Sequence, residues 1–270
     1  MKIYTEEQLP QGSQEWLDVR KKHGTASEAA SVMSVSPWTP KTPLQLWQLK
    51  NGELKIEENF AMRIGNETEE EARQSFNKQT RLTYVPVCIT DTIKGIPLMA
   101  SLDGMSLGDQ SSMVEIKVPL NGSCSPLWAS MELNEELPIQ YVLQMQQQML
   151  VSKQPSCNFY VYDRKNKVGL NRIVYADTTI QSDIIEAWTK YFSGKPEAGD
   201  KDVTIRDDKE WAESAVLWRM AKSDEKQAKE KAAELRQKLI DLCKDRSYKG
   251  HQVQVTKNND TGGWSIRKVK

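Results

Sequence analysis

Three residues in the middle of the chain have types and spacing that suit metal-assisted hydrolysis. Asp103 ends an apolar run in "MASLDGM", and Glu115 and Lys117 lie two residues apart in "MVEIKVP". Because side chains alternate between the faces of a strand, Glu115 and Lys117 share one face, while Val114 and Ile116 point to the other. Each motif alone has an ordinary explanation. An Asp before a Gly is a common turn signal, and a Glu–Lys pair on a half-exposed strand is a surface ion pair that contributes at most about 1 kcal/mol.

The two motifs together predict more than either alone. Two adjacent antiparallel strands that bring Asp103, Glu115 and Lys117 to one place make a site of hard oxygen ligands, which Mg²⁺ or Mn²⁺ prefers. There the metal lowers the pKa of a water molecule, and the lysine orients it for attack. This chemistry suits phosphodiester hydrolysis. The order D-x(n)-E-x-K is the pattern of PD-(D/E)xK nucleases, although Leu102 takes the position before the Asp that is usually Pro.

An amino-terminal motif predicts a place for an anion. Thr25 and Glu28 have the S/T-x-x-E spacing of a capping box, which puts Ser27 in the first turn of a helix. Free backbone N–H groups and the helix dipole favour an anion there, and Arg20 can grip a phosphate with two hydrogen bonds. The alternative is a serine that starts a helix and binds no ligand.

Five collinear motifs indicate a family. They are "WLDVR" with "TASE", "IGNETEEEAR", "ASLDG", "VEIKVP" and "YVLQMQ". Through them the chain resembles the phage lambda exonuclease family, also called YqaJ-type viral recombinases, over about residues 10–195. The resemblance implies a two-metal, processive exonuclease that degrades the 5′ strand of duplex DNA and leaves a 3′ overhang. It also implies a homotrimeric ring around DNA and a single-strand annealing protein as the recombination partner.

The resemblance also assigns roles at the reaction centre. Four residues are implied to bind two Mg²⁺ or Mn²⁺ ions: Asp103, Glu115, Ile116 through its backbone carbonyl, and Glu69 directly or through water. Lys117 is implied to serve the attacking water, and Gln144 to position that water or the scissile phosphate. Glu69 is also one of several glutamates in "ETEEE", and Gln144 lies in a polar helical stripe, so each has a structural alternative.

A second set of residues is implied to hold the DNA end. Arg20, Ser27 and Ser101 are assigned to the pocket for the terminal 5′ phosphate, and Trp16 to stacking near the terminal base pair. Trp16 can equally be a core residue. The lambda enzyme has an arginine six residues after the catalytic lysine, where this sequence has Ser123.

The elements that must position these residues are predicted from hydrophobic patterning. Helices are expected over 13–23, 25–34, 59–80 and 138–153, and short strands in "LTYVPVCIT", "IPLMASLDG", "SSMVEIKVP" and "SCNFYVYDR". This order predicts an α/β (α+β) fold, a PD-(D/E)xK restriction-endonuclease-like core with a mixed sheet flanked by helices. We expect a nuclease domain over 1–200 and an extension over 201–270, with a long charged helix followed by a β-hairpin around "NDTGG".

The composition narrows the function classes. The 37 Lys and Arg balance 37 Asp and Glu, so no global field attracts nucleic acid and any DNA contact must be local. The four isolated cysteines speak against a zinc or iron–sulfur site. No signal peptide or membrane segment is predicted, so we expect a cytoplasmic protein. The family resemblance implies that it is encoded by a phage or prophage and acts in a bacterial host. Two alternatives to the exonuclease stay open: a structure- or site-specific endonuclease, and a non-catalytic DNA-end-binding scaffold.

Overall fold

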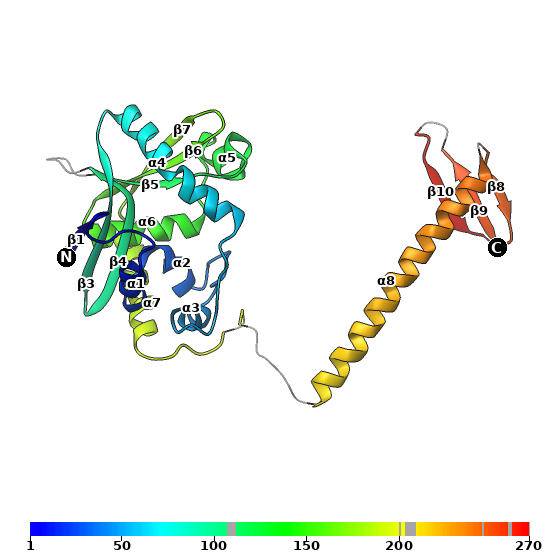
Figure 1. Cartoon of the computed structure of the whole chain (residues 1–270), viewed down its shortest axis with the longest axis horizontal. Helices are drawn as coiled ribbons and strands as arrows, with labels where there is room; N and C mark the ends of the chain where they lie inside the picture. The colour runs from blue at the N-terminus through cyan, green and yellow to red at the C-terminus, as the bar shows by residue number, and fades with distance from the viewer. Residues whose placement is uncertain (107–111, 200, 203–208, 245, 259–260, 270) are drawn as a thin grey trace. The chain divides into compact units, whose positions relative to one another are not determined.

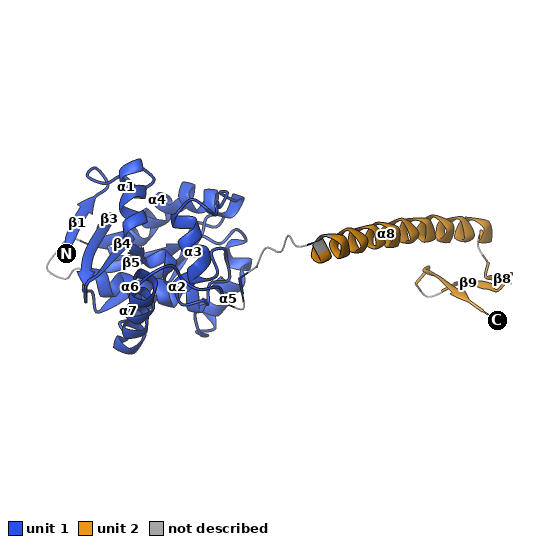
Figure 2. Cartoon of the chain, turned by 90° about the horizontal axis from the view of Figure 1, so that it is seen from below, with its two compact units in different colours: residues 1–203 blue, residues 204–270 orange. Residues whose placement is uncertain are grey.

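The computed structural model describes residues 1–106, 112–199, 201–202, 209–244, 246–258 and 261–269. The chain divides into two compact units, residues 1–203 and 204–270, which are described separately (Figure 2). Asp200, where the predicted nuclease domain ends, lies outside the described residues.

Unit 1 is built on a seven-stranded sheet (Figure 1). Along the sheet the order is β1-β3-β4-β5-β6-β7, and the short β2 pairs with β4. Neighbours are antiparallel except for β5 with β6 and β2 with β4, so the sheet is mixed, as predicted. The strands are β1 (Lys2–Thr5), β2 (Gly24–Thr25), β3 (Tyr84–Ile93), β4 (Ile96–Ser106), β5 (Met113–Lys117), β6 (Ser156–Asp163) and β7 (Val168–Tyr175).

Helices connect these strands, and side-chain caps fix where several of them begin. Ser13 caps the first helix, Thr42 the third and Asn59 the fourth, each by accepting a backbone N–H in the first turn. The α-helices of unit 1 are α1 (Gln14–Lys22), α2 (Ala29–Val32), α3 (Pro43–Lys50), α4 (Phe60–Thr80), α5 (Pro126–Glu132), α6 (Ile139–Ser152) and α7 (Thr178–Phe192).

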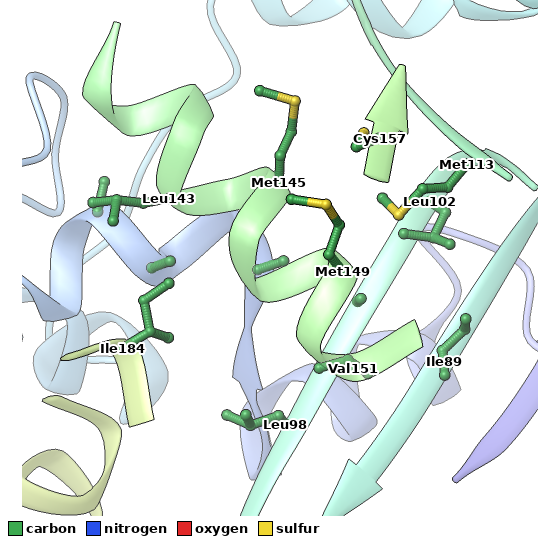
Figure 3. Close-up of a cluster of buried hydrophobic side chains, with 14 of the residues drawn as sticks. Ile89, Leu98, Leu102, Met113, Leu143, Met145, Met149, Val151, Cys157 and Ile184 are labelled. Carbon is green, nitrogen blue, oxygen red and sulfur yellow. The ribbon is translucent and has the colours of Figure 1, made fainter. Parts of the chain in front are cut away.

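Unit 1 buries three apolar clusters, of which the third consists of Leu9, Trp16, Cys88 and Met99, while the first two lie on opposite faces of the sheet. The larger of these two lies between the sheet and α6, where Leu143, Met145 and Met149 meet strand residues such as Met113 and Leu102 (Figure 3). The smaller one joins α4 to the opposite face, and its members are Ala72, Phe76, Tyr84, Val114, Ile116, Tyr160 and Tyr162, with Val118 packed against them. The alternation predicted for β5 is therefore confirmed, and the face that carries Glu115 lies on the side of α6.

Unit 2 consists of one long helix and a small sheet. The helix α8 (Lys209–Cys243) is continuous over 35 residues. After it, β8 (Tyr248–Gly250), β9 (Val253–Lys257) and β10 (Trp264–Lys268) form an antiparallel sheet in the order β10-β9-β8. The predicted helix and hairpin are confirmed, and β8 adds a third strand. Asn259 and Asp260 of the predicted turn lie outside the described residues.

Candidate active site

Glu115 is the centre of the predicted reaction site, and it is completely buried. Its side chain is 0% exposed. Oε1 accepts hydrogen bonds from Lys117 Nζ and, at 2.7 Å, from Gln144 Nε2. Oε2 accepts a hydrogen bond of 2.6 Å from Gln148 Nε2. The interpretation of Glu115 and Lys117 as a surface ion pair is therefore wrong. Burying a carboxylate is costly unless donors surround it, and Glu115 has three donors.

A β-bulge brings Asp103 to the same side as Glu115. Val85 pairs with Met105 and Val87 with Leu102, so β4 carries one more residue than β3 over this stretch. Both Leu102 and Met105 contact the cluster beneath α6, which shows that the extra residue reverses the alternation. The Asp-Gly pair therefore lies within β4 and is no turn.

Asp103 also joins the strand that carries Glu115. Its Oδ2 accepts a hydrogen bond of 2.7 Å from the backbone N–H of Ile116. The next residue, Gly104, pairs with Val114, and a Cβ there would lie 2.8 Å from the side chains of Tyr84 and Val114. Only glycine fits this close approach, so the local packing fixes the place of Asp103.

Glu69 reaches the edge of this group from α4. Its Oε1 accepts a hydrogen bond of 3.1 Å from Arg73 Nη1, and the same nitrogen donates to the backbone oxygen of Asp103 at 2.6 Å. Arg73 also pairs with Glu70. Arg73, which was not predicted to have a role, thus ties Glu69 to the backbone of Asp103.

The buried carboxylates repel one another. Burial, together with the charges of Glu115 and Glu69, raises the pKa of Asp103 well above its ordinary value. Burial also raises the pKa of Glu69, with a further contribution from Glu115, while Arg73 acts in the opposite direction. A second positive charge at this place would relieve the repulsion.

Lys117 keeps its positive charge. Burial acts to lower its pKa, but the charges of Glu115 and Asp103 outweigh burial and raise the pKa above the ordinary lysine value. Its Nζ also lies 5.3 Å from the centre of the Tyr141 ring, within range of a cation–π contact. In this arrangement, the neighbouring carboxylates hold Lys117 in its charged form.

Three consecutive glutamines of α6 hold the site together, and all three are buried. Gln146 binds the backbone oxygen of Tyr175 through Nε2 and the backbone N–H of Asp177 through Oε1. Gln147 donates to the backbone oxygen of Gly24. Gln148 donates to Glu115. These three amides join α6 to β7, β2 and β5. Only Gln148 belongs to the polar stripe that contains Gln144, and both side chains of that stripe donate to Glu115.

A second cluster gathers all the residues predicted to hold the DNA end. The Arg20 guanidinium lies 4.6 Å from the centre of the Trp16 ring and donates to Ser27 Oγ at 3.3 Å. Trp16 Nε1 donates to Ser101 Oγ at 3.2 Å. This cluster contains one acidic neighbour, Glu28, which lies 3.5 Å from Arg20.

The helix expected over 25–34, with Ser27 in its first turn, is present over 26–32 but only part of it is α-helical. The capping box of Thr25 and Glu28 is present, but it starts a 3₁₀ turn (Ala26–Glu28) that continues into the four-residue α2. A helix this short has little dipole, so an anion here depends on Arg20 and the hydroxyl of Ser27. Glu28 is also bound by Lys50 Nζ at 2.8 Å, and this buried pair ties α3 to the cluster.

One side chain connects the two clusters. Gln148 Nε2 contacts both Glu115 Oε2 and, at 3.2 Å, the backbone oxygen of Ser101. Among the described residues its Oε1 is the buried side-chain atom that finds no hydrogen-bond partner. Gln148 is not among the residues predicted from the sequence, although its position four residues after Gln144 places both on one side of the helix.

Ser123, where the lambda enzyme has an arginine, lies in a loop fixed by Asp163. The Asp163 carboxylate accepts hydrogen bonds from the backbone N–H groups of Ser123 at 2.9 Å and Lys165 at 2.9 Å, and from Asn166 Nδ2 at 2.8 Å. Gly122 has a φ of +50°, and a Cβ there would meet the same carboxylate at 2.4 Å. This loop therefore needs a glycine for close approach and offers no cation at Ser123.

The oxygen atoms at this site suit the metal ion that the fold implies. Asp103 and Glu115 provide hard carboxylate oxygens beside a fixed lysine, and Gln148 Oε1 is a buried oxygen without a partner. This set fits Mg²⁺ or Mn²⁺. Within the described ranges, however, no group of three or more His, Cys, Asp and Glu is arranged to hold a metal ion, and Glu69 pairs with Arg73.

Comparisons with known proteins agree with this geometry. A model of the YqaJ-like viral recombinase domain matches residues 15–155. The alkaline exonuclease LHK-Exo from Laribacter hongkongensis is similar in structure, with 25% identity over 67% of this chain and 91% of that chain and a TM-score of 0.54. Its complex with dAMP matches at 24% identity over the same shares, with a TM-score of 0.55. A search of curated proteins finds no match.

The described helices include none that is long and apolar enough to cross a membrane. The mixed sheet, the flanking helices and the similar exonucleases establish the PD-(D/E)xK fold class. Because the family model covers more than half of the chain, the protein belongs to the YqaJ-like viral recombinase domain family, whose membership supports a nuclease that acts in phage-type recombination.

Proposed function

We propose that the protein is a Mg²⁺-dependent exonuclease that digests the 5′ strand of linear duplex DNA and leaves a 3′ overhang. The connection through Gln148 carries this proposal. It joins the buried carboxylate of Glu115 to Ser101, which belongs to the cluster around Arg20. A site that grips a terminal phosphate at a fixed offset from the reacting residues suits removal of nucleotides from an end.

The side chains divide the work by position. Arg20 and Ser27 bind the terminal 5′ phosphate, and Trp16 lies against the terminal base pair. Lys117 stabilises the negative charge that develops at the scissile phosphate, because it is a fixed cation in a buried site. The amide of Gln144 donates to Glu115 Oε1, to which Lys117 also donates, and positions the attacking water.

Asp103 and Glu115 would hold the metal, with the backbone carbonyl of Ile116. Two ions per site would also require Glu69 to leave Arg73. When bound, Mg²⁺ supplies Lewis-acid chemistry at the scissile phosphate. The repulsion between the carboxylates of Asp103 and Glu115 favours the metal-bound protein over the metal-free protein.

The wider assembly follows from the family resemblance. We include in the proposal a homotrimeric ring around DNA and a single-strand annealing protein that binds the exposed 3′ strand. Sedimentation of the purified protein tests the ring, and a shift in that sedimentation on adding the annealing protein tests the partnership.

Linear duplex DNA labelled at either end, compared with closed circular DNA, tests the proposed activity. The account predicts early release of a 5′ label as mononucleotide, gradual shortening of 3′-labelled strands, and intact circles. Nicking of closed circles would replace the exonuclease with an endonuclease. Binding of ends without any cleavage in Mg²⁺ would replace it with a scaffold protein.

A further inference from the structure

The small sheet of unit 2 has one face packed and one face exposed. Figure 1 shows this sheet beside the end of α8. Val255 is 3% exposed, and with Val253 and Tyr248 it lines a hollow whose other side is formed by Leu239 and Cys243 of α8. In an antiparallel sheet, paired residues point to the same side, so the register assigns the remaining strand residues to faces. Lys249, Gln254 and Arg267 are cross-strand neighbours and lie on the side away from the helix.

Every side chain of this outer face, made of Lys249, Gln254, Thr256, Ser265 and Arg267, can donate a hydrogen bond, and none of them is acidic. Lys249, Ser265 and Arg267 are exposed, and the other two are half-buried. The three described strands contain no acidic residue on either face. Carboxylate-free surfaces with Arg, Lys, Gln, Thr and Ser are typical of proteins that contact phosphates and base edges.

The face is ordered before any ligand binds. Gln254 Oε1 accepts hydrogen bonds from Arg267 Nη2 at 2.9 Å and Nε at 3.3 Å. Gln254 Nε2 donates to Thr256 Oγ1 at 3.4 Å. The guanidinium is thus held over the middle strand and needs little further ordering, which lowers the entropic cost of binding.

The charge of the segment supports the same partner. The whole chain is neutral, with 37 basic and 37 acidic residues, but residues 244–270 contain seven Lys and Arg against two Asp. A strongly anionic partner would therefore be attracted to this segment although the chain as a whole has no net charge.

We propose that the outer face of β8–β10 binds duplex DNA through its backbone, as a second DNA contact beyond the nuclease site. The sheet presents its side chains to the groove, with Lys249 and Arg267 on the phosphates that border it. The inference rests on the proposed function in taking duplex DNA as the ligand. Its test therefore measures binding apart from cleavage.

The test uses full-length protein and a fluorescent DNA dumbbell, a duplex closed by hairpins at both ends, in EDTA. Lys249→Gln/Arg267→Gln should bind about tenfold more weakly than wild type, and the slope of log Kd against log salt should fall by about 2. The matched control is Lys226→Gln/Lys231→Gln, which removes the same charge from exposed positions of α8. It should bind within about twofold of wild type.

Several outcomes would overturn the proposal. One is equal affinity and salt slope for the sheet variant and wild type. Another is an equal loss in the α8 control, which would assign the effect to general charge. A change in sedimentation of the sheet variant with unchanged DNA affinity would assign the face to a second copy of the chain.

A measurement on the wild-type protein guards against a variant that fails to fold. Hydrogen exchange of residues 248–268 should slow when the dumbbell is added, and exchange that stays unchanged there would contradict the proposal. Absence of cleavage by wild-type protein in Mg²⁺ would instead contradict the proposed nuclease, so the two failures are distinguishable.

Discussion

Gln148 donates its side-chain amide to Glu115 Oε2 at 2.6 Å, and its own Oε1 is buried with no hydrogen-bond partner among the described residues. Turning the amide around would place oxygen against carboxylate, so the donor must face Glu115. A buried, unpaired oxygen costs about 1–3 kcal/mol. Its position between the two clusters therefore indicates a role in binding or positioning.

Gln148→Met keeps the volume but removes the donor to Glu115. The lost donor to Glu115 destabilises the protein by about 2 kcal/mol, and removal of the unpaired Oε1 offsets part of this, so we expect the free energy of unfolding to fall by about 1 kcal/mol. Cleavage should slow as well, since the link to Ser101 is lost. Urea denaturation and a nuclease assay measure the two effects. Gln140→Met on the same helix is the control, and wild-type values for Gln148→Met would contradict the proposed connection.

Metal binding should be visible as a change in stability. Wild-type protein should gain thermal stability in Mg²⁺, by about 2.7 kcal/mol at one hundred times the dissociation constant. Asp103→Asn removes a ligand carboxylate and should lose most of this gain while remaining folded. The control is Asp183→Asn at an exposed position of α7. An equal Mg²⁺-dependent shift in Asp103→Asn and wild type would refute the assignment of Asp103.

Arg20 should determine the preference for phosphorylated ends. Its guanidinium is placed by Trp16 and Ser27. Position 123 is a serine, so it provides no second arginine to bind the phosphate. Arg20→Gln should therefore reduce the ratio of rates on 5′-phosphate and 5′-hydroxyl duplexes, by about tenfold for the loss of one charged hydrogen bond. Lys22→Gln, an exposed change on the same helix, should keep the wild-type ratio. The same ratio in Arg20→Gln would remove Arg20 from the phosphate pocket.

The lowered pKa of Asp163 predicts how the stability of the protein depends on pH. The backbone N–H of Ser123, with the other donors around the carboxylate, holds the pKa of Asp163 well below its ordinary range. A carboxyl whose pKa is lowered by folding stabilises the protein above its unfolded pKa of about 4, and this contribution is lost as the pH falls toward the folded value. Asp163→Asn should thus be less stable than wild type at pH 7. The gap should narrow in urea titrations below about pH 4, and a gap that is constant with pH would contradict this role.

The elements that carry the site were predictable because their patterns are local. The alternation of Val114, Ile116 and Val118 appears in the sequence and in the cluster beneath α4. The long helix α4 was predictable from its cap at Asn59 and from the basic Lys78 in its last turn, whereas its first turn contains no acidic residue. Two strands at the sheet edges, β1 and β7, were missed, since half-exposed edge strands carry weak hydrophobic signals.

Other features depend on tertiary structure and leave no local signal. The bulge in β4 arises from the pairing register between β3 and β4, which the sequence of β4 alone does not determine. The Asp-Gly pair at 103–104 therefore suggested a turn. The full burial of Glu115 requires α6 to cover it, and the donors from Gln144 and Gln148 meet it only after folding. Buried polar networks of this kind cannot be distinguished from a solvated polar stripe by spacing alone.

The most direct test of the account is the rate at which wild type and Lys117→Ala release mononucleotides from 5′-phosphorylated linear duplex, each in Mg²⁺ and in EDTA. Lys117 is a fixed cation against Glu115, so its loss should slow cleavage by at least about one hundredfold, while the far-ultraviolet spectrum stays that of wild type. EDTA should abolish release by both proteins. Release by Lys117→Ala at the wild-type rate, or by either protein in EDTA, would contradict the assignment of this site.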